Sequence, residues 1–126
     1  MVALRWAGVV LCTPDRRRVA CVHVERRGNG LELPKGAVER GQAALPAARK
    51  HCFAQIGLSP NLTSAAPRLV QGRGVFYHCF GAAAPPWSAA RGVAPVWLDV
   101  DEALATLRPD HGAVLAWALA LPEMQS

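Results

Sequence analysis

A loop rich in turn residues leads directly into a bounded helix over residues 33–58. The loop, 34–41, contains one proline and two glycines. Apolar residues then recur at three- and four-residue steps, which predicts a helix over 43–55 with one buried face. They are Leu45, Ala48, Cys52 and Ile56. Gly57 provides a stop signal. The other side of this helix is expected to face solvent or a ligand.

Short apolar runs on both sides of this segment predict β-strands. They cover residues 7–13, 18–25, 31–33, 68–71, 74–80 and 96–98. In the run 74–80, aromatic and polar residues alternate with the two-residue period of a strand, so that Phe76, His78 and Phe80 share one face. Strands and helices mixed in this order predict an α/β (α+β) fold in one domain over 1–126.

Two helices are expected after the last strand. Asp99 and Glu102 have the spacing of a capping box at a helix start, and Asp110 can cap a closing helix over 113–121. The preceding segment, 81–95, is a long loop of alanine and proline with Trp87 at its centre. Loops of this length in compact domains are often functional.

The composition excludes several classes of protein. A hydrophobic content of 52% and a charged content of 18% describe a folded chain rather than a disordered one. No apolar run approaches the roughly 20 residues that span a bilayer. The four cysteines lack the paired spacing of a zinc or redox site. We therefore expect a cytoplasmic protein with reduced thiols and without membrane contact.

Charge is distributed unevenly along the chain. Of the 14 Lys and Arg residues, 13 precede position 92, where only 4 of the 9 Asp and Glu residues lie. A basic surface favours anionic ligands. This balance predicts an anionic partner, although solvated arginines explain the same charges equally well.

The segment 33–58 resembles the Nudix box of the Nudix hydrolases (MutT-like), G-x5-E-x7-R-E-U-x-E-E-x-G-U, with U an aliphatic residue. Gly36 matches the first glycine, Gly57 and Leu58 match the final pair, and Cys52 matches the aliphatic position. The segment 97–104 is similar to the late strand and helix of this family. The resemblance implies a Nudix-like α/β/α sandwich with a mixed central sheet.

The charged residues of the box are replaced in this chain. Gln42 stands at the first glutamate, Lys50 at the arginine, and His51, Ala54 and Gln55 at the three helix glutamates. In the family these carboxylates hold Mg²⁺, which bridges the phosphates and generates the attacking hydroxide. Because this Nudix box is degenerate, we expect no catalytic residue at these positions, no metal and no cofactor. A lone His51 suits Zn²⁺ better than Mg²⁺ and does not by itself make a metal site.

Three other carboxylates are candidates for a substitute base. They are Glu39, Asp99 and Asp101. Each has a simpler explanation: Glu39 belongs to the family's loop pattern, Asp99 to the capping box and Asp101 to a first helical turn. Residual hydrolysis would depend on Glu39 or Asp99.

The favoured hypothesis is a pseudoenzyme that binds a nucleotide or another phosphate compound, or acts as an interaction module. Lysine and arginine can pair with phosphate without an intervening metal ion. The expected ligand is an anionic small molecule such as a nucleotide or a nucleoside diphosphate derivative. The candidate binding residues are Lys35, Gly36, Arg40, Lys50, His51 and Trp87. Trp87 could stack on a base, or instead pack in the core or between two copies of a homodimer.

Two alternatives remain open. The first is an active Nudix hydrolase that cleaves a nucleoside diphosphate linked to another moiety, through a relocated Mg²⁺ or Mn²⁺ site. The second is nucleic-acid binding through Arg16-Arg17-Arg18, Arg26 and Arg27. No recognisable nucleic-acid motif accompanies these arginines, so this second alternative is the weaker one.

Overall fold

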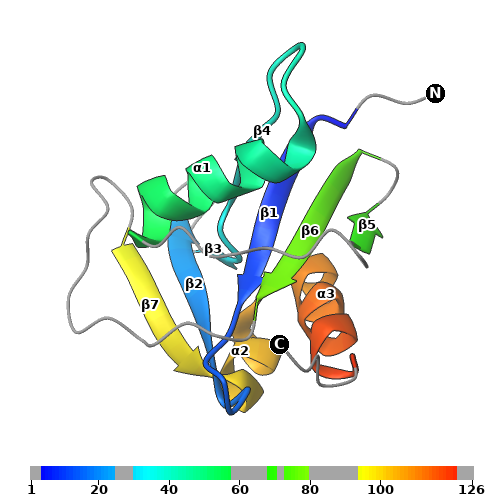
Figure 1. Cartoon of the computed structure of the whole chain (residues 1–126). Coiled ribbons are helices and arrows are strands. Elements are labelled where there is room, and N and C mark those ends of the chain that lie inside the picture. Colours follow the sequence, from blue (N-terminus) through cyan, green and yellow to red (C-terminus); the bar gives the residue numbers. More distant parts are fainter. Residues whose placement is uncertain (1–3, 25–29, 58–67, 71–72, 80–93, 122–126) are drawn as a thin grey trace.

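The computed structural model describes residues 4–24, 30–57, 68–70, 73–79 and 94–121. Figure 1 shows the strands and helices that these residues form. The strands are β1 (Trp6–Leu11), β2 (Arg18–Val24), β3 (Gly30–Glu32), β4 (Lys35–Ala37), β5 (Arg68–Val70), β6 (Gly74–Cys79) and β7 (Ala94–Asp99). The helices are α1 (Ala44–Ile56), α2 (Val100–Thr106) and α3 (Pro109–Leu119).

The strands form two sheets that meet along β1 and β2. One sheet has the order β4-β1-β6-β5, and the other has the order β3-β2-β7. The first sheet is mixed, because β1 pairs parallel with β6 but antiparallel with β4. In the second sheet β2 pairs antiparallel with both neighbours. A bridge between Cys12 and Val19 joins the ends of β1 and β2.

Helices cover both faces of this strand layer, as Figure 1 shows. On one face α1 packs against β1, and Cys52 and Ile56 lie in a core with Ala7 and Val9. On the other face α2 and α3 enclose a second core around Phe76, Leu33 and Leu115. The result is a three-layer α/β/α arrangement with a mixed sheet, and it confirms the predicted fold class.

All six predicted strands are present among the described residues, within two residues of their expected bounds. In β6, Phe76 and Tyr77 lie in opposite cores, as the alternation predicts. The prediction for 34–41 was incomplete because part of this loop is the strand β4, paired with Trp6, Ala7 and Gly8 of β1. A three-residue strand with a central glycine has no apolar alternation, so its pairing partner determines it.

The predicted helix starts near the C-terminus were partly wrong. Asp99 is the N-cap of α2, but its side chain makes no capping hydrogen bond. The Val100 N–H donates instead to the Arg17 carbonyl, at 2.8 Å. Helix α3 begins at Pro109 rather than at 113, with Arg108 as its N-cap, because proline suits the first helical turn. Asp110 therefore lies inside the first turn of α3.

Helix α1 has the predicted boundaries to within one residue. Its buried residues are Ala47, Ala48, Cys52 and Ile56, whereas Leu45 is half-buried. Gly57 ends the helix in the left-handed region, at φ 89°, and its N–H donates to the Phe53 carbonyl. Burial raises the pKa of the Cys52 thiol to about 12, so Cys52 packs as a small apolar residue.

No helix in the described part of the chain is both long and apolar enough to cross a membrane.

Candidate functional site

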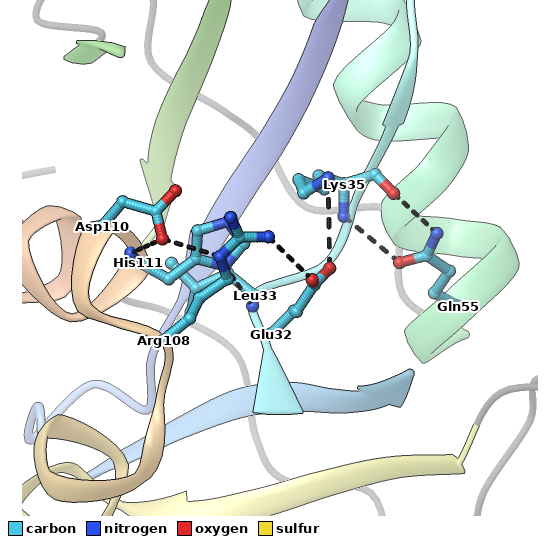
Figure 2. Close-up of polar contacts among 7 residues, drawn as sticks. All are labelled: Glu32, Leu33, Lys35, Gln55, Arg108, Asp110 and His111. Carbon is cyan, nitrogen blue, oxygen red and sulfur yellow. Dashed lines mark hydrogen bonds and ion pairs between the residues drawn. The ribbon is translucent and has the colours of Figure 1, made fainter. Parts of the chain in front are cut away.

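The degenerate box positions of α1 lie against strand β4. The side-chain amide of Gln55 bonds both backbone groups of Lys35 (Figure 2). It accepts from the Lys35 N–H at 3.2 Å and donates to the Lys35 carbonyl at 2.8 Å. An amide can serve both groups because it carries a donor and an acceptor, whereas a carboxylate can only accept. Gln55 therefore joins the end of α1 to the loop.

His51 makes a second junction between α1 and β4. Its Nε2 lies 2.7 Å from the Ala37 carbonyl, so Nε2 carries a proton and donates it. The ring also covers Gly36, where an added Cβ would overlap the ring atoms. Gly36 is thus required for space. A Zn²⁺ ion bound through Nε2 would have to break the bond to Ala37.

The remaining box positions lie at the surface. Gln42 closes a turn, since its Oε1 accepts from the Glu39 N–H and its own N–H donates to the Glu39 carbonyl. Lys50, Ala54 and Arg40 are exposed. The prediction that the box face points to solvent or ligand is therefore correct for Lys50 and Ala54, but wrong for His51 and Gln55. These two residues are half-buried against β4.

Helix α3 holds the same loop from the opposite side, as Figure 2 shows. The Arg108 guanidinium lies 3.1 Å from a Glu32 carboxylate oxygen, and its Nε donates to Asp110 at 2.7 Å. The Lys35 ammonium lies 4.0 Å from Glu32 and 5.3 Å from the centre of the Trp6 ring. The Lys35 charge is therefore directed at Glu32 and Trp6, so a bound anion would compete with both.

The neighbouring His111 is the most buried ionisable side chain of this region, at 1% exposed. Its Nδ1 accepts a hydrogen bond from the Leu33 N–H at 3.1 Å. Burial lowers the pKa of His111 to about 4. The ring is thus neutral, with its proton on Nε2.

The sequence analysis did not identify this cluster around Glu32, Arg108 and His111. Its members come from segments about 75 positions apart, and only Asp110, as a helix cap, and Lys35, as a ligand-binding residue, were considered. The available signal was local: five charged or imidazole side chains at 32–35 and 108–111 interrupt apolar runs. Periodicity alone does not pair such residues.

The substitute carboxylates are not brought together with one another, and of the two at issue here only Glu39 lies beside a box position, Gln42. Glu39 follows β4, which pairs with the first residues of β1. Asp99 pairs with Arg18 at the start of β2, beside the last residues of β1. The two therefore lie at opposite ends of β1. Among the described residues, no group of three or more His, Cys, Asp or Glu side chains is placed to hold a metal ion.

A separate cleft of about 720 Å³ lies between the β1–β2 turn and the start of α2. Its lining includes Arg16, Arg17 and Arg18, but also Asp15, Asp99, Asp101 and Glu102. Nη1 of Arg16 bonds the carbonyls of Leu119 and Leu121 at the end of α3. The three arginines therefore face carboxylates and helix carbonyls rather than forming a uniformly basic surface for nucleic acid.

Five residues named in the sequence analysis lie outside the described residues: Arg26, Arg27, Leu58, Phe80 and Trp87. The same holds for most of the 81–95 loop, of which only Ala94 and Pro95 belong to β7.

Comparison with solved structures identifies the fold. The chain is similar to an Ap4A hydrolase of C. elegans, with a TM-score of 0.75 and 12% identity over 92% of this chain and 96% of that one. It also resembles a MutT from work on Aliivibrio salmonicida and Vibrio cholerae, with a TM-score of 0.67 and 18% identity over 94% and 98% of the two chains. It is also similar to the E. coli ORF135 protein, with a TM-score of 0.66 and 18% identity over 96% of this chain and 91% of that one.

These neighbours are Nudix hydrolases, so the chain has the Nudix fold. No protein-family model and no curated protein matches the sequence.

Proposed function

We propose that this Nudix-fold protein has lost ordinary Mg²⁺-dependent pyrophosphohydrolase activity and binds an anionic small molecule. The candidate ligand is a nucleotide or a nucleoside diphosphate derivative. The observation that carries the proposal is the use of His51 and Gln55 as hydrogen-bonding partners of β4. At two positions where the resemblance implies metal-binding carboxylates, this chain has an imidazole and an amide that bond the backbone of β4.

The charge around the box supports direct phosphate binding. Between residues 33 and 57 the only acidic side chain is Glu39, whereas the basic ones are Lys35, Arg40, Arg49 and Lys50. Arg40, Arg49 and Lys50 are exposed. Arginine and lysine bind phosphate through charge-assisted hydrogen bonds that need no bridging metal. Trp87 is retained in this proposal as a stacking residue for the base.

The alternative is an active hydrolase that acts on a nucleoside diphosphate linked to another moiety. Its support is the likeness to hydrolases over more than nine-tenths of the chain. It requires Mg²⁺ or Mn²⁺ at a site built elsewhere, from Glu39 or from Asp99 and Asp101. Such a site would have to draw on rearranged carboxylates, since Glu39 and Asp99 lie at opposite ends of β1.

A thermal-shift screen of nucleotides, dinucleotides and sugar nucleotides tests the proposal, with and without Mg²⁺ or Mn²⁺. A ligand that binds only the native state raises Tm by mass action. We expect a compound with a diphosphate group to raise Tm equally in the presence and absence of metal. Arg40→Gln and Lys50→Gln should weaken its binding. Arg68→Gln, which removes an exposed charge on edge strand β5, is the matched control.

Two results would overturn this proposal. Metal-dependent release of a nucleoside monophosphate, abolished by Glu39→Gln, would establish the hydrolase alternative instead. Equal loss of binding in Arg68→Gln and Lys50→Gln would show a nonspecific charge effect rather than a site on α1.

A further inference from the structure

The segment from Glu32 to Ala37 makes hydrogen bonds or ion pairs with both helical layers. On the α1 side, Gln55 holds the peptide groups of Lys35 and His51 holds the Ala37 carbonyl. On the α3 side, the two contacts are the Arg108–Glu32 ion pair and the hydrogen bond from the Leu33 N–H to His111. Figure 2 shows the contacts of Arg108 and His111 on one side of the chain segment from Glu32 to Lys35, and those of Gln55 on the other side.

Only one of these backbone hydrogen bonds has an acceptor that can take up a proton as the pH falls. The Gln55 amide does not titrate, and His51 uses Nε2 as a donor. His111 uses Nδ1 as an acceptor, and Nδ1 is the atom that gains a proton when this ring becomes charged. A protonated Nδ1 would point its hydrogen at the Leu33 N–H, so that two donors would meet and the bond would be lost.

The surroundings of His111 favour the neutral ring. It lies in the first turn of α3, where the helix dipole disfavours a positive charge. It packs edge-on against Phe76, with 5.2 Å between ring centres. The charged groups that face it are Arg108 at the N-cap of α3, Asp110 in α3, Glu32 in β3 and Lys35 in β4. Two are positive and two negative, and Arg108 already pairs with both carboxylates, so burial decides the outcome.

We propose that His111 is a proton-sensitive positioning residue: its neutral ring holds the Leu33 amide, and protonation of Nδ1 by solvent releases the loop that carries Lys35 and Gly36. The effect on ligand binding rests on the proposed function, because Lys35 and Gly36 belong to the candidate ligand site. His111 itself lies in the core and acts through Leu33.

The direction of the pH effect follows from the two protonation states. The histidine pKa is 6.5 in its ordinary state and about 4 in the folded protein. The hydrogen bond from the Leu33 N–H to His111 therefore has its full stabilising effect above pH 6.5. It weakens as the pH falls below 6.5 and is lost as the pH passes through 4, since the released ring binds a proton that the held ring excludes.

Amide hydrogen exchange of the free protein tests the release without any ligand. After correction for intrinsic rates, we expect the opening constant at Leu33 to rise about 50-fold between pH 7 and pH 4.5, from one linked proton. The Gly57 amide is the internal control, because it lies outside this loop at the end of α1 and donates to the Phe53 carbonyl, which does not titrate. Equal pH dependence at Leu33 and Gly57, or none at Leu33, would overturn the proposal.

The variant His111→Asn provides an acceptor oxygen near the place of Nδ1 that takes up no proton. We expect it to remove the pH dependence at Leu33. Should this variant not fold, a chemical-shift titration of the His111 ring in the natural protein decides instead. Titration with the normal histidine midpoint, near pH 6.5, would contradict the held neutral state.

Calorimetry with ADP, at pH 7 and pH 5, tests the consequence for the candidate site. We expect the natural protein to bind ADP more weakly at pH 5 than at pH 7, and His111→Asn to show a smaller loss of affinity. Because ADP itself takes up the same protons in both experiments, the comparison with His111→Asn corrects for that effect. The same pH dependence in both proteins would separate His111 from ligand binding. No ADP binding at either pH counts against the proposed function, whereas the exchange experiment still tests the role of His111.

Discussion

Gln55 binds Lys35 through both backbone groups of that residue, accepting at 3.2 Å and donating at 2.8 Å. This pairing makes the amide at position 55 chemically specific. A glutamate there would keep the contact with the N–H, but would place a second oxygen against the Lys35 carbonyl. The residue that the Nudix box would have at this position is therefore incompatible with the observed junction.

The variant Gln55→Glu should destabilise the protein by about 1–3 kcal/mol, because one half-buried hydrogen bond is replaced by two opposed acceptors. Ala54→Glu is the control, since it adds the same charge one residue earlier at an exposed position. Its effect should stay within about 0.5 kcal/mol. Urea unfolding of both variants measures the difference. Equal losses would mean that the Gln55–Lys35 contact contributes nothing to stability.

The variant Gly36→Ala should also destabilise the fold, although the backbone at Gly36 is not in the left-handed region. Its Cβ would overlap the His51 ring, and displacing that ring costs about 1–3 kcal/mol by analogy with overpacked cores. In the background His51→Ala the same substitution should cost only a few tenths of a kcal/mol, because the ring is gone. A double-mutant cycle checks this. An unchanged cost in both backgrounds would exclude the ring as the cause.

Rebuilding the box tests the relation between these junctions and metal binding. The five changes are Gln42→Glu, Lys50→Arg, His51→Glu, Ala54→Glu and Gln55→Glu. We expect the rebuilt protein to have a lower Tm than the natural one in the presence of EDTA, because the bonds to Lys35 and Ala37 are lost. Mg²⁺ should raise its Tm, but leave the natural protein unchanged. Saturable Mg²⁺ binding to the natural protein with micromolar affinity would contradict this prediction.

Arg16 combines an unfavourable backbone conformation with a useful side chain. Its φ is 60°, and its guanidinium bonds the carbonyls at the end of α3. Both Arg16→Ala and Arg16→Gly remove the guanidinium, but only glycine accepts the left-handed conformation without cost. Arg16→Gly should therefore be the more stable variant by about 1 kcal/mol. Thermal unfolding of the pair measures this difference, and equal Tm values would show that the strain is absent.

Features set by neighbouring residues were predictable from the sequence. The 3.6-residue period of α1, its stop at Gly57 and the alternation in β6 all depend on local geometry, and the structure has them. The Nudix fold was also accessible, because the spacing between Gly36 and Gly57 is independent of the missing carboxylates. The structural neighbours of this chain share the fold, although their sequences are 12–18% identical to it.

Features set by distant residues were not predictable. The strand β4 exists because β1 lies beside it, and its three residues carry no pattern of their own. His51 and Gln55 were expected to face solvent or ligand, since a helical period shows which side is polar but not whether a strand covers it. His111 likewise gains its role from Leu33, 78 positions away. Long-range partners of single polar side chains determine this site.

The parallel pairing of β1 with β6 constrains how the chain can fold. Trp6 is aligned with Gly74, and Leu11 with Cys79, so this part of the sheet closes across nearly 70 residues. Until residues 74–79 leave the ribosome, one edge of the apolar strand β1 has no hydrogen-bonding partner. Long-range strand pairing slows folding and exposes unpaired edges to other chains. During synthesis, this edge of β1 is therefore open to pairing with other chains for longer than the edge that pairs with β4.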